Sequence, residues 1–453
     1  MEDRRITILK DEKVGKAVNN LAAPAIVGML VMAIYNFVDT VFVSWYDPLA
    51  TSATQVVLPV MLIASAIGLS LGIGSASYIS RLLGMKDKSR AEKVVMTAFI
   101  TGIILGLIST LLNYLFMEGI FGFFGANPGN MQMTLDYGKY ILLGYTFMIL
   151  NMIMNNVLRS EGSARYQMIA MVTGSVLNII LDPIFIFGLN MGVAGAAIAT
   201  TLSNMVSFII LISMFLNKKT MLKMHIKNFS PEWALYREIL VIGLPTLFKQ
   251  LLFSFSMKLL NTAAGDLGGN DLLGTISIVI KIISVPSYIV FGYGQGFQPV
   301  AGYNYGADNP KRVMDSFKYT LKITTLVMVI TAFILSVFGF AVIKIFQTTD
   351  IMAEYAIKAL RYNSIGLVFL GFINTVTVFF QALGKGFKAL LMSIARQGLF
   401  FIPIILIIPG IIGIDGVMVS QSLADVLSLL LAGLLVIPYL KTSNIEALFQ
   451  KTH

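Results

Sequence analysis

Long apolar runs with almost no charge constrain this chain more than any other feature of its sequence. A run of roughly 20 apolar residues is long enough to cross a bilayer as a helix. Helices and closed barrels are the only structures that satisfy their own backbone in hydrocarbon. Of the 453 residues, 57% are hydrophobic and 12% are charged, against about 25% charged residues in soluble domains. We therefore predict an all-α polytopic membrane protein.

About twelve segments have the length and composition of a transmembrane helix. They lie near residues 17–43, 53–80, 94–117, 134–158, 164–188, 193–216, 236–262, 272–303, 313–346, 354–382, 388–409 and 416–440. Lysine and arginine cluster before the first segment and after every second one, and the loops between carry almost none. By the positive-inside rule, both termini are expected in the cytoplasm of a multi-pass protein of the cell (inner) membrane. Because the net charge of +10 lies in these clusters, no nucleic acid partner is expected.

The two halves of the chain repeat each other at a spacing of 222 residues. The matching positions are Gly72 and Gly294, Gly74 and Gly296, Gly84 and Gly306, and Arg90 and Arg312. An even number of segments separates the copies, so they share one orientation in the membrane. We predict two pseudo-symmetric six-helix bundles, with an N-terminal lobe over 1–216, a cytoplasmic linker over 217–234 and a C-terminal lobe over 235–453.

Two acids stand in otherwise apolar segments, Asp39 in AIYNFVDTVFV and Asp182 in SVLNIILDPIFIFG. A carboxylate in hydrocarbon costs at least ~2.5–3.5 kcal/mol and is a functional-site hypothesis by default. Asn178 precedes Asp182 by four residues, so both share one helix face, and Pro183 is expected to kink the helix beside them. Our interpretation is that Asp39 and Asp182 face each other inside the first lobe. The alternative for each is a solvated acid near a helix end.

Other classes of protein lack their signatures in this chain. There is no cysteine, and the two histidines, His225 and His453, lie in the linker and at the last residue. No phosphate-binding loop is present, so a primary pump is not expected, and neither is a cofactor. An intramembrane aspartyl protease would need Gly-x-Gly-Asp, whereas AAGD around Asp266 is expected in an outer loop. We predict no enzyme and no catalytic residues, and a channel stays an alternative on composition alone.

Several motifs resemble those of the multidrug and toxic compound extrusion (MATE) family. They are YNFVDTVFV, GIGSASYISRLLG, LRSEG and LNIILDPIFIFGLNMGVAGAAIATTLSN, and the pattern is most similar to the DinF-type and archaeal branch. The resemblance implies a secondary active efflux antiporter that exports amphipathic, often cationic compounds in exchange for H+ or Na+.

The resemblance also implies which residues couple the ion. In that branch the coupling network lies in the first lobe, and the matching residues are Asp39, Tyr35, Asn178, Asp182 and Thr200, with Thr201 as the other candidate for the threonine. Asp39, Asn178, Asp182 and Thr200 would be the ligands if the ion is Na+. The other bacterial branch has acids in its seventh and tenth spans, and this chain has none in the interior of those spans.

The expected partners are a small-molecule substrate and the lipid bilayer. No obligate protein partner is expected. Candidates for the substrate cavity are Met32, Asn36, Asn151 and Asn155, because amides within a span need partners. A flippase of lipid-linked sugars is the alternative function, and it would use basic residues in its cavity. Lys249 and Lys281 are the residues to examine for that alternative, while the competing interpretation is that they snorkel or pair structurally.

Overall fold

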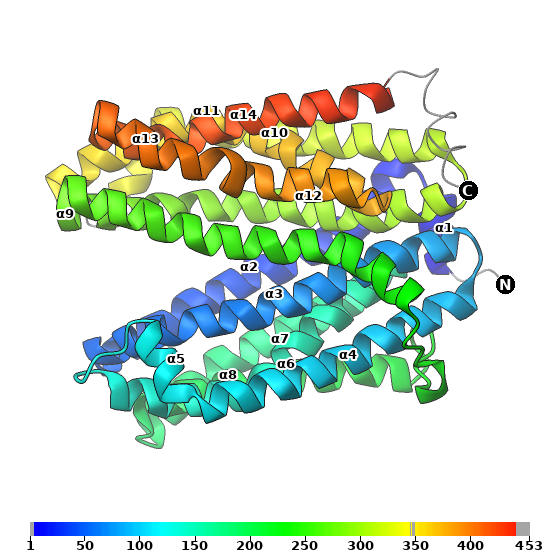
Figure 1. Cartoon of the computed structure of the whole chain (residues 1–453), viewed down its shortest axis with the longest axis horizontal. Coiled ribbons are helices and arrows are strands. Elements are labelled where there is room, and N and C mark those ends of the chain that lie inside the picture. The colour runs from blue at the N-terminus through cyan, green and yellow to red at the C-terminus, as the bar shows by residue number, and fades with distance from the viewer. Residues whose placement is uncertain (1–3, 345, 347–348, 441–453) are drawn as a thin grey trace. The chain divides into compact units, whose positions relative to one another are not determined.

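The computed structural model describes residues 4–344, 346 and 349–440, which form helices joined by short loops (Figure 1). The first half contains α1 (Arg4–Lys10), α2 (Val14–Tyr46), α3 (Pro48–Gly84), α4 (Lys88–Leu115), α5 (Met117–Phe123), α6 (Met131–Ser160), α7 (Ala164–Pro183), η1 (Ile184–Gly188), α8 (Gly192–Leu216) and η2 (Ile226–Asn228). The second contains α9 (Trp233–Gly306), α10 (Pro310–Lys344), α11 (Asp350–Ala382), α12 (Gly386–Ile394), η3 (Ala395–Phe401), α13 (Ile402–Ile412) and α14 (Ile414–Leu440). No strand occurs in these ranges, which confirms the all-α fold class.

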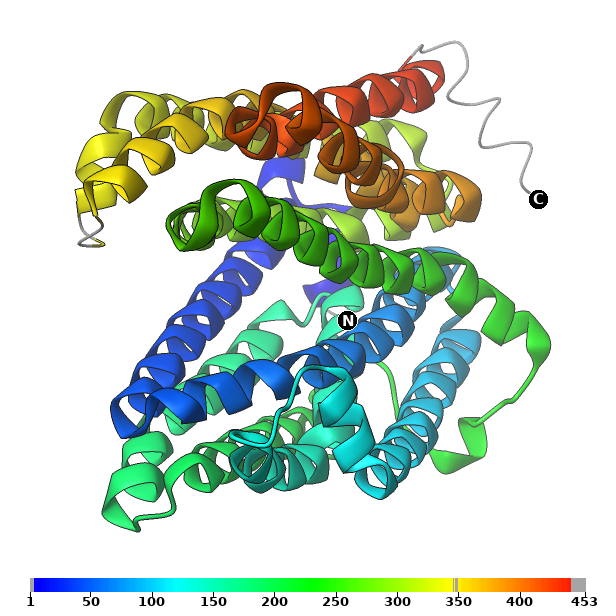
Figure 2. The same cartoon turned by 60° about the vertical axis from the view of Figure 1, so that its left-hand side comes forward.

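Eleven helical segments of the described ranges are long and apolar enough to cross a bilayer, and one of them, α9, contains two crossings. At ~1.5 Å per residue its 74 residues would extend about 110 Å, several times the ~30 Å hydrocarbon core. The helix is broken at Gly269, where φ is 59° and ψ is −150°. Its two limbs run back alongside each other (Figures 1 and 2). The described chain therefore has the twelve predicted crossings. Asp266, expected in a loop, lies in the helix near this break.

Polar side chains at the loop ends start several of these spans. Asp47 caps α3, and its carboxylate accepts a hydrogen bond of 2.7 Å from the backbone N–H of Leu49. Asp87 caps α4 through a bond of 3.0 Å from the N–H of Arg90. Such caps satisfy backbone donors that the first helical turn leaves unpaired. Short polar loops are therefore enough to separate the apolar segments.

The helices form two compact units, each with one central helix. The first unit comprises residues 1–11 and 23–243, and the second comprises residues 12–22 and 244–453. Within the first unit α6 packs on α3, α4 and α8, and within the second α11 packs on α10 and α14. These two helices are the most buried of the candidate spans. The lobe boundaries predicted from the sequence stay a prediction, and residues 441–453 of the C-terminal lobe lie outside the described residues.

Repeated glycines occupy equivalent positions in the two units. A side chain at Gly72 would lie 2.9 Å from Nδ2 of Asn156 on the central helix α6. A side chain at Gly294 would lie 2.8 Å from Nδ2 of Asn374 on the central helix α11. Both glycines thus let a neighbouring helix approach closely, which explains why the sequence repeats them.

A buried glutamate holds the connector of residues 217–232 against the first unit. Glu161 follows α6 and is 0% exposed, and its Oε2 accepts hydrogen bonds from the N–H groups of Met221 and Leu222, at 2.9 and 3.0 Å. Its Oε1 accepts from Ser163 at 2.7 Å and pairs with Arg5 at 3.3 Å. Burial raises the pKa of Glu161 above its ordinary value, although these donors oppose the shift. The LRSEG motif therefore anchors the connector.

Candidate functional site

Asn178 and Asp182 lie one turn apart on α7, just before the end of the regular α-helix. Pro183 follows with helical backbone angles, and the next five residues form the π-helical turn η1. The kink predicted at Pro183 stays a prediction, and the irregularity that the structure shows here is this π-helical turn. Both side chains are buried, with exposed fractions of 1% and 0%. Single π-helical turns are uncommon and occur frequently at functional sites.

The amide of Asn178 connects Asp182 with α8. Its Nδ2 donates to Oδ1 of Asp182 and to Oγ1 of Thr200, both at 3.3 Å. Thr201 instead donates to the backbone carbonyl of Tyr140 at 2.8 Å. Thr200 is therefore the threonine at this cluster, which resolves the ambiguity left by the sequence.

Asp39 comes to the same cluster from α2. Its carboxyl group is close enough to that of Asp182 for their charges to interact, and Tyr35, one turn earlier on α2, interacts with both. Tyr137 of α6 does the same and is buried, but it was not among the predicted site residues. Tyr137 lies near the polar start of α6. Tyrosines are common at the ends of membrane helices, where they meet the bilayer interface, so the sequence around Tyr137 does not mark it as a site residue.

Three buried oxygen atoms of the cluster accept no hydrogen bond from the described residues. They are Oδ1 of Asp39, Oδ1 of Asn178 and Oδ2 of Asp182. These atoms can only accept while the carboxyl groups are ionised, and a buried acceptor without a donor is costly. A proton would turn one carboxyl group into a donor, and a hard cation would take several oxygens as ligands at once. These three oxygen atoms can therefore bind either H+ or Na+.

Three of the four residues predicted to line a substrate cavity make local hydrogen bonds, and the described residues give none to the side chain of Asn155. Asn36 is exposed, and its Nδ2 donates to the carbonyl of Met32 at 2.9 Å. Asn151 is buried, and its Nδ2 donates to the backbone carbonyl of Asn204 at 2.9 Å. Asn155, one turn along α6, is 9% exposed, and its Oδ1 accepts no bond within the described chain. The role of these four residues in a cavity stays a prediction.

The basic residues singled out in the second half differ in their surroundings. Lys281 is exposed, which agrees with the structural interpretation. Lys249 is half-buried and lies 5.3 Å from the ring centre of Phe291. Asp425 is 2% exposed and pairs with Arg396, with Nε to Oδ1 at 2.6 Å. Arg396, which was not among the predicted residues, lies in the π-helical segment η3 between α12 and α13.

Comparison with known proteins identifies the family. The MatE family model matches residues 24–184 and 245–407, one match in each half. The chain belongs to the MATE family. Multidrug export protein MepA of Staphylococcus aureus (strain N315) is 31% identical over 437 residues, which are 96% of each protein.

Solved structures agree with this assignment across the whole chain. A MOP superfamily transporter from Pyrococcus furiosus Vc1, described as having a binding pocket of reverse polarity, is 28% identical with a TM-score of 0.92. The match covers 98% of this chain and 99% of that one. An outward-facing multidrug resistance MATE family transporter of the MOP superfamily gives the same identity and TM-score, with 99% of each chain covered.

These comparisons confirm the predicted family and the predicted class of function. MATE proteins are multi-pass membrane transporters that act on small molecules in multidrug efflux, and they are not enzymes. The efflux prediction is therefore favoured over the flippase alternative.

Proposed function

We propose that this MATE protein exports amphipathic, cationic compounds across the cell (inner) membrane in exchange for H+ or Na+. The observation that carries the proposal is the cluster of three unpaired buried oxygens on Asp39, Asn178 and Asp182. Because the cluster gains stability when it binds a cation, its occupancy can be linked to a conformational change. That MepA is a multidrug export protein supports the direction of transport.

The coupling step follows from the positions of the two carboxylates. When the site is empty, the negative charges of Asp39 and Asp182 repel each other across α2 and α7. Binding a proton or Na+ removes this repulsion and draws the two helices together. The π-helical turn after Pro183 and the proline at position 24 of α2 are the points where each helix can bend. We propose that this movement reduces the substrate cavity of the first unit, so that ion entry drives substrate exit.

The substrate would lie beside the ion site in the same unit. We propose Met32 and Asn36 of α2 and Asn151 and Asn155 of α6 as its wall, with Tyr35 joining the wall to the ion site. Methionine and aromatic side chains adapt to different shapes, and amide groups can bind polar parts of a compound. The carboxylates would favour a cation when the ion site is empty. Loading the site would remove that attraction.

The setting of the protein follows from the same proposal. The lipid bilayer surrounds the spans, and both termini are placed in the cytoplasm because the lysine and arginine clusters fall on the side that they share. No cofactor, no nucleic acid and no obligate protein partner are needed for the exchange.

A transport assay in vesicles tests this function. The protein is reconstituted in liposomes, and accumulation of ethidium is followed under an imposed pH gradient or an imposed Na+ gradient. At least one gradient is expected to drive accumulation against the dye gradient, and Asp39→Asn is expected to abolish it. If neither gradient drives accumulation, or if the Asp39→Asn protein matches the original one, the proposed exchange is wrong.

A further inference from the structure

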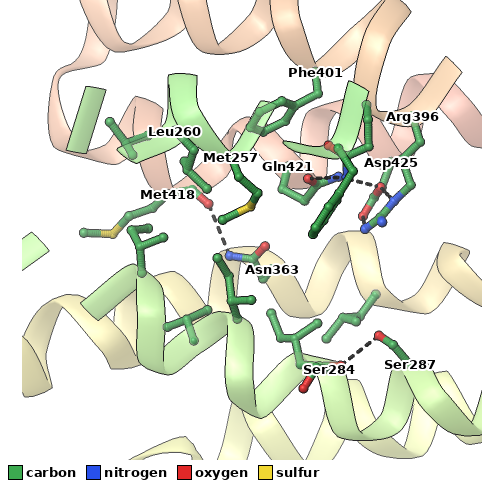
Figure 3. A pocket seen from close by; sticks show the side chains of 18 of the residues that line it. Met257, Leu260, Ser284, Ser287, Asn363, Arg396, Phe401, Met418, Gln421 and Asp425 are labelled. Carbon is green, nitrogen blue, oxygen red and sulfur yellow. Dashed lines mark hydrogen bonds and ion pairs between the residues drawn. The ribbon is translucent and has the colours of Figure 1, made fainter. Parts of the chain in front are cut away.

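Two adjoining cavities lie entirely within the second unit. The first has a volume of about 270 Å³ and is shown in Figure 3; the second has a volume of about 340 Å³. Their walls share Phe253, Tyr288, Phe291, Arg396 and Gln397. Cavities of this size can enclose a small organic molecule. The ion-coupling residues all belong to the first unit, so these cavities are a separate feature.

The wall of the first cavity is mostly apolar, with its charges close together (Figure 3). Met257, Leu260, Phe401 and Met418 contribute apolar surface. Asn363, on the same wall, uses its amide to donate to backbone carbonyls of Ala359 and Met418, at 2.8 and 3.3 Å. This part of the cavity therefore fits the apolar body of a ligand.

The single carboxylate among the lining residues is already neutralised. Oδ1 of Asp425 accepts from Nε of Arg396 at 2.6 Å and from Nε2 of Gln421 at 3.0 Å. Its Oδ2 accepts from Nη2 of Arg396 at 3.3 Å. Three donors on one buried carboxylate satisfy it well, so Asp425 has little remaining attraction for a cationic ligand.

The second cavity brings a further positive charge without an acid beside it. Lys249 lines this cavity together with Arg396, and within the described ranges no carboxylate lies within 4.0 Å of its ammonium group. Contact with the Phe291 ring at 5.3 Å offsets only part of the cost of a cation in a membrane span. Ser393 lines the same cavity, is 2% exposed, and its Oγ has no partner among the described residues. With Lys249, Arg396 and Asp425, the lining carries one net positive charge.

We propose that this double cavity binds an amphipathic compound with a single negative charge, either a carboxylate or a phosphate. Its anionic group lies between Lys249 and Arg396, and its apolar body lies against Met257, Leu260 and Phe401. The partly used guanidinium of Arg396 and the ammonium of Lys249 supply the donors that an anion needs. The proposal goes beyond the exchange reaction, because the site is separate from the coupling acids.

Direct binding to the full-length protein tests this site. The protein is placed in phosphatidylcholine nanodiscs, and the fluorescence of dansyl-undecanoic acid is titrated beside that of its uncharged methyl ester. The acid is expected to bind more tightly than the ester. The Lys249→Met protein is expected to bind the acid about tenfold more weakly, the range of a charged hydrogen bond, with ester binding unchanged. Unchanged ester binding also shows that the variant is folded.

A lysine on the same helix provides the matched control. Lys281→Met removes an exposed positive charge of α9 that lines neither cavity and is expected to leave binding of the acid unchanged. The paired change Arg396→Gln with Asp425→Asn leaves the net charge at one and is expected to preserve the preference for acid over ester. Equal binding of acid and ester, or equal loss in the two lysine variants, would overturn the proposal.

A second arm identifies the source of the anion. Adding phosphatidylglycerol to the nanodiscs is expected to compete with the dansyl acid if the natural ligand is a membrane lipid. If the acid still binds with the Lys249-dependent affinity, the ligand is an amphipathic anion other than that lipid. Either result is consistent with the anion site and identifies the source of its ligand. Whether the site exists is decided by the comparison of acid and ester.

Discussion

Replacing Asp182 by asparagine is the change that most sharply tests the coupling site. The substitution preserves the size of the side chain and one acceptor oxygen for the amide of Asn178, which now lies 3.3 Å from Oδ1 of Asp182. It removes the negative charge from a fully buried position. The fold should therefore persist while the affinity for the ion falls.

The expected loss follows from the electrostatic interaction between a carboxylate and a monovalent cation. At about 4 Å and an effective dielectric constant of ~20, one such pair contributes about 4 kcal/mol. Because each 1.4 kcal/mol is a factor of ten, ion affinity is expected to fall about a thousandfold. An ion gradient that drives the original protein well would then drive the Asp182→Asn protein at close to the background rate.

The assay compares ethidium accumulation in proteoliposomes under stepped pH and Na+ gradients. Asp47→Asn is the matched control, since Asp47 belongs to the same unit but caps α3, and asparagine caps a helix as well as aspartate does. The control is expected to transport like the original protein. Accumulation by Asp182→Asn with an unchanged dependence on both gradients would refute the reasoning.

Three other changes have expected outcomes. Asn178→Leu removes the amide between Asp182 and Thr200, so the ion concentration for half-maximal transport should rise by about tenfold or more. Arg396→Gln leaves the buried Asp425 without its ion pair and should lower the free energy of unfolding by about 3–5 kcal/mol. Adding Asp425→Asn should recover much of this loss. Thermal unfolding in nanodiscs measures both effects. The pKa of Glu161 is raised above 4.5, so the folded state binds the proton more tightly. Stability should therefore fall as the pH rises from about 4.5 through the raised pKa, and Glu161→Gln should lack this slope in melting curves recorded across that range.

The spans of this protein were predictable because the bilayer imposes one length and one composition on them. The segments predicted near 134–158 and 164–188 correspond to α6 and to α7 with η1, with ends that differ by at most three residues. The reversal inside α9 was also expected as two spans, but the first limb continues into the predicted loop, over residues 263–271, as far as Gly269. Loop boundaries are harder to predict because polar residues such as Asp266 can extend a helix beyond its apolar part.

The candidate site was predictable where an acid interrupts an apolar run. Asp39 and Asp182 stand out for this reason, and the structure brings them together with Asn178 and Thr200. Tyr137 was missed because it lies near the polar start of α6, where a tyrosine carries no distinguishing signal.

The cavities of the second unit could not be predicted for a different reason. Arg396 and Asp425 are 29 residues apart, and no periodic pattern links them. The sequence marks Lys249 as a basic residue in an apolar span. Only the structure shows that it lines a cavity, because α9 packs there on the segment that contains Arg396 and Gln397.

Competition between ion and substrate on the purified protein tests the central claim most directly. The affinity for ethidium is measured by fluorescence anisotropy while the pH is lowered or Na+ is added. The account predicts that one of these ions weakens ethidium binding to the original protein, as reciprocal linkage requires, and that the double variant Asp39→Asn with Asp182→Asn binds ethidium independently of both. Equal weakening of ethidium binding in the original protein and in the double variant would contradict it.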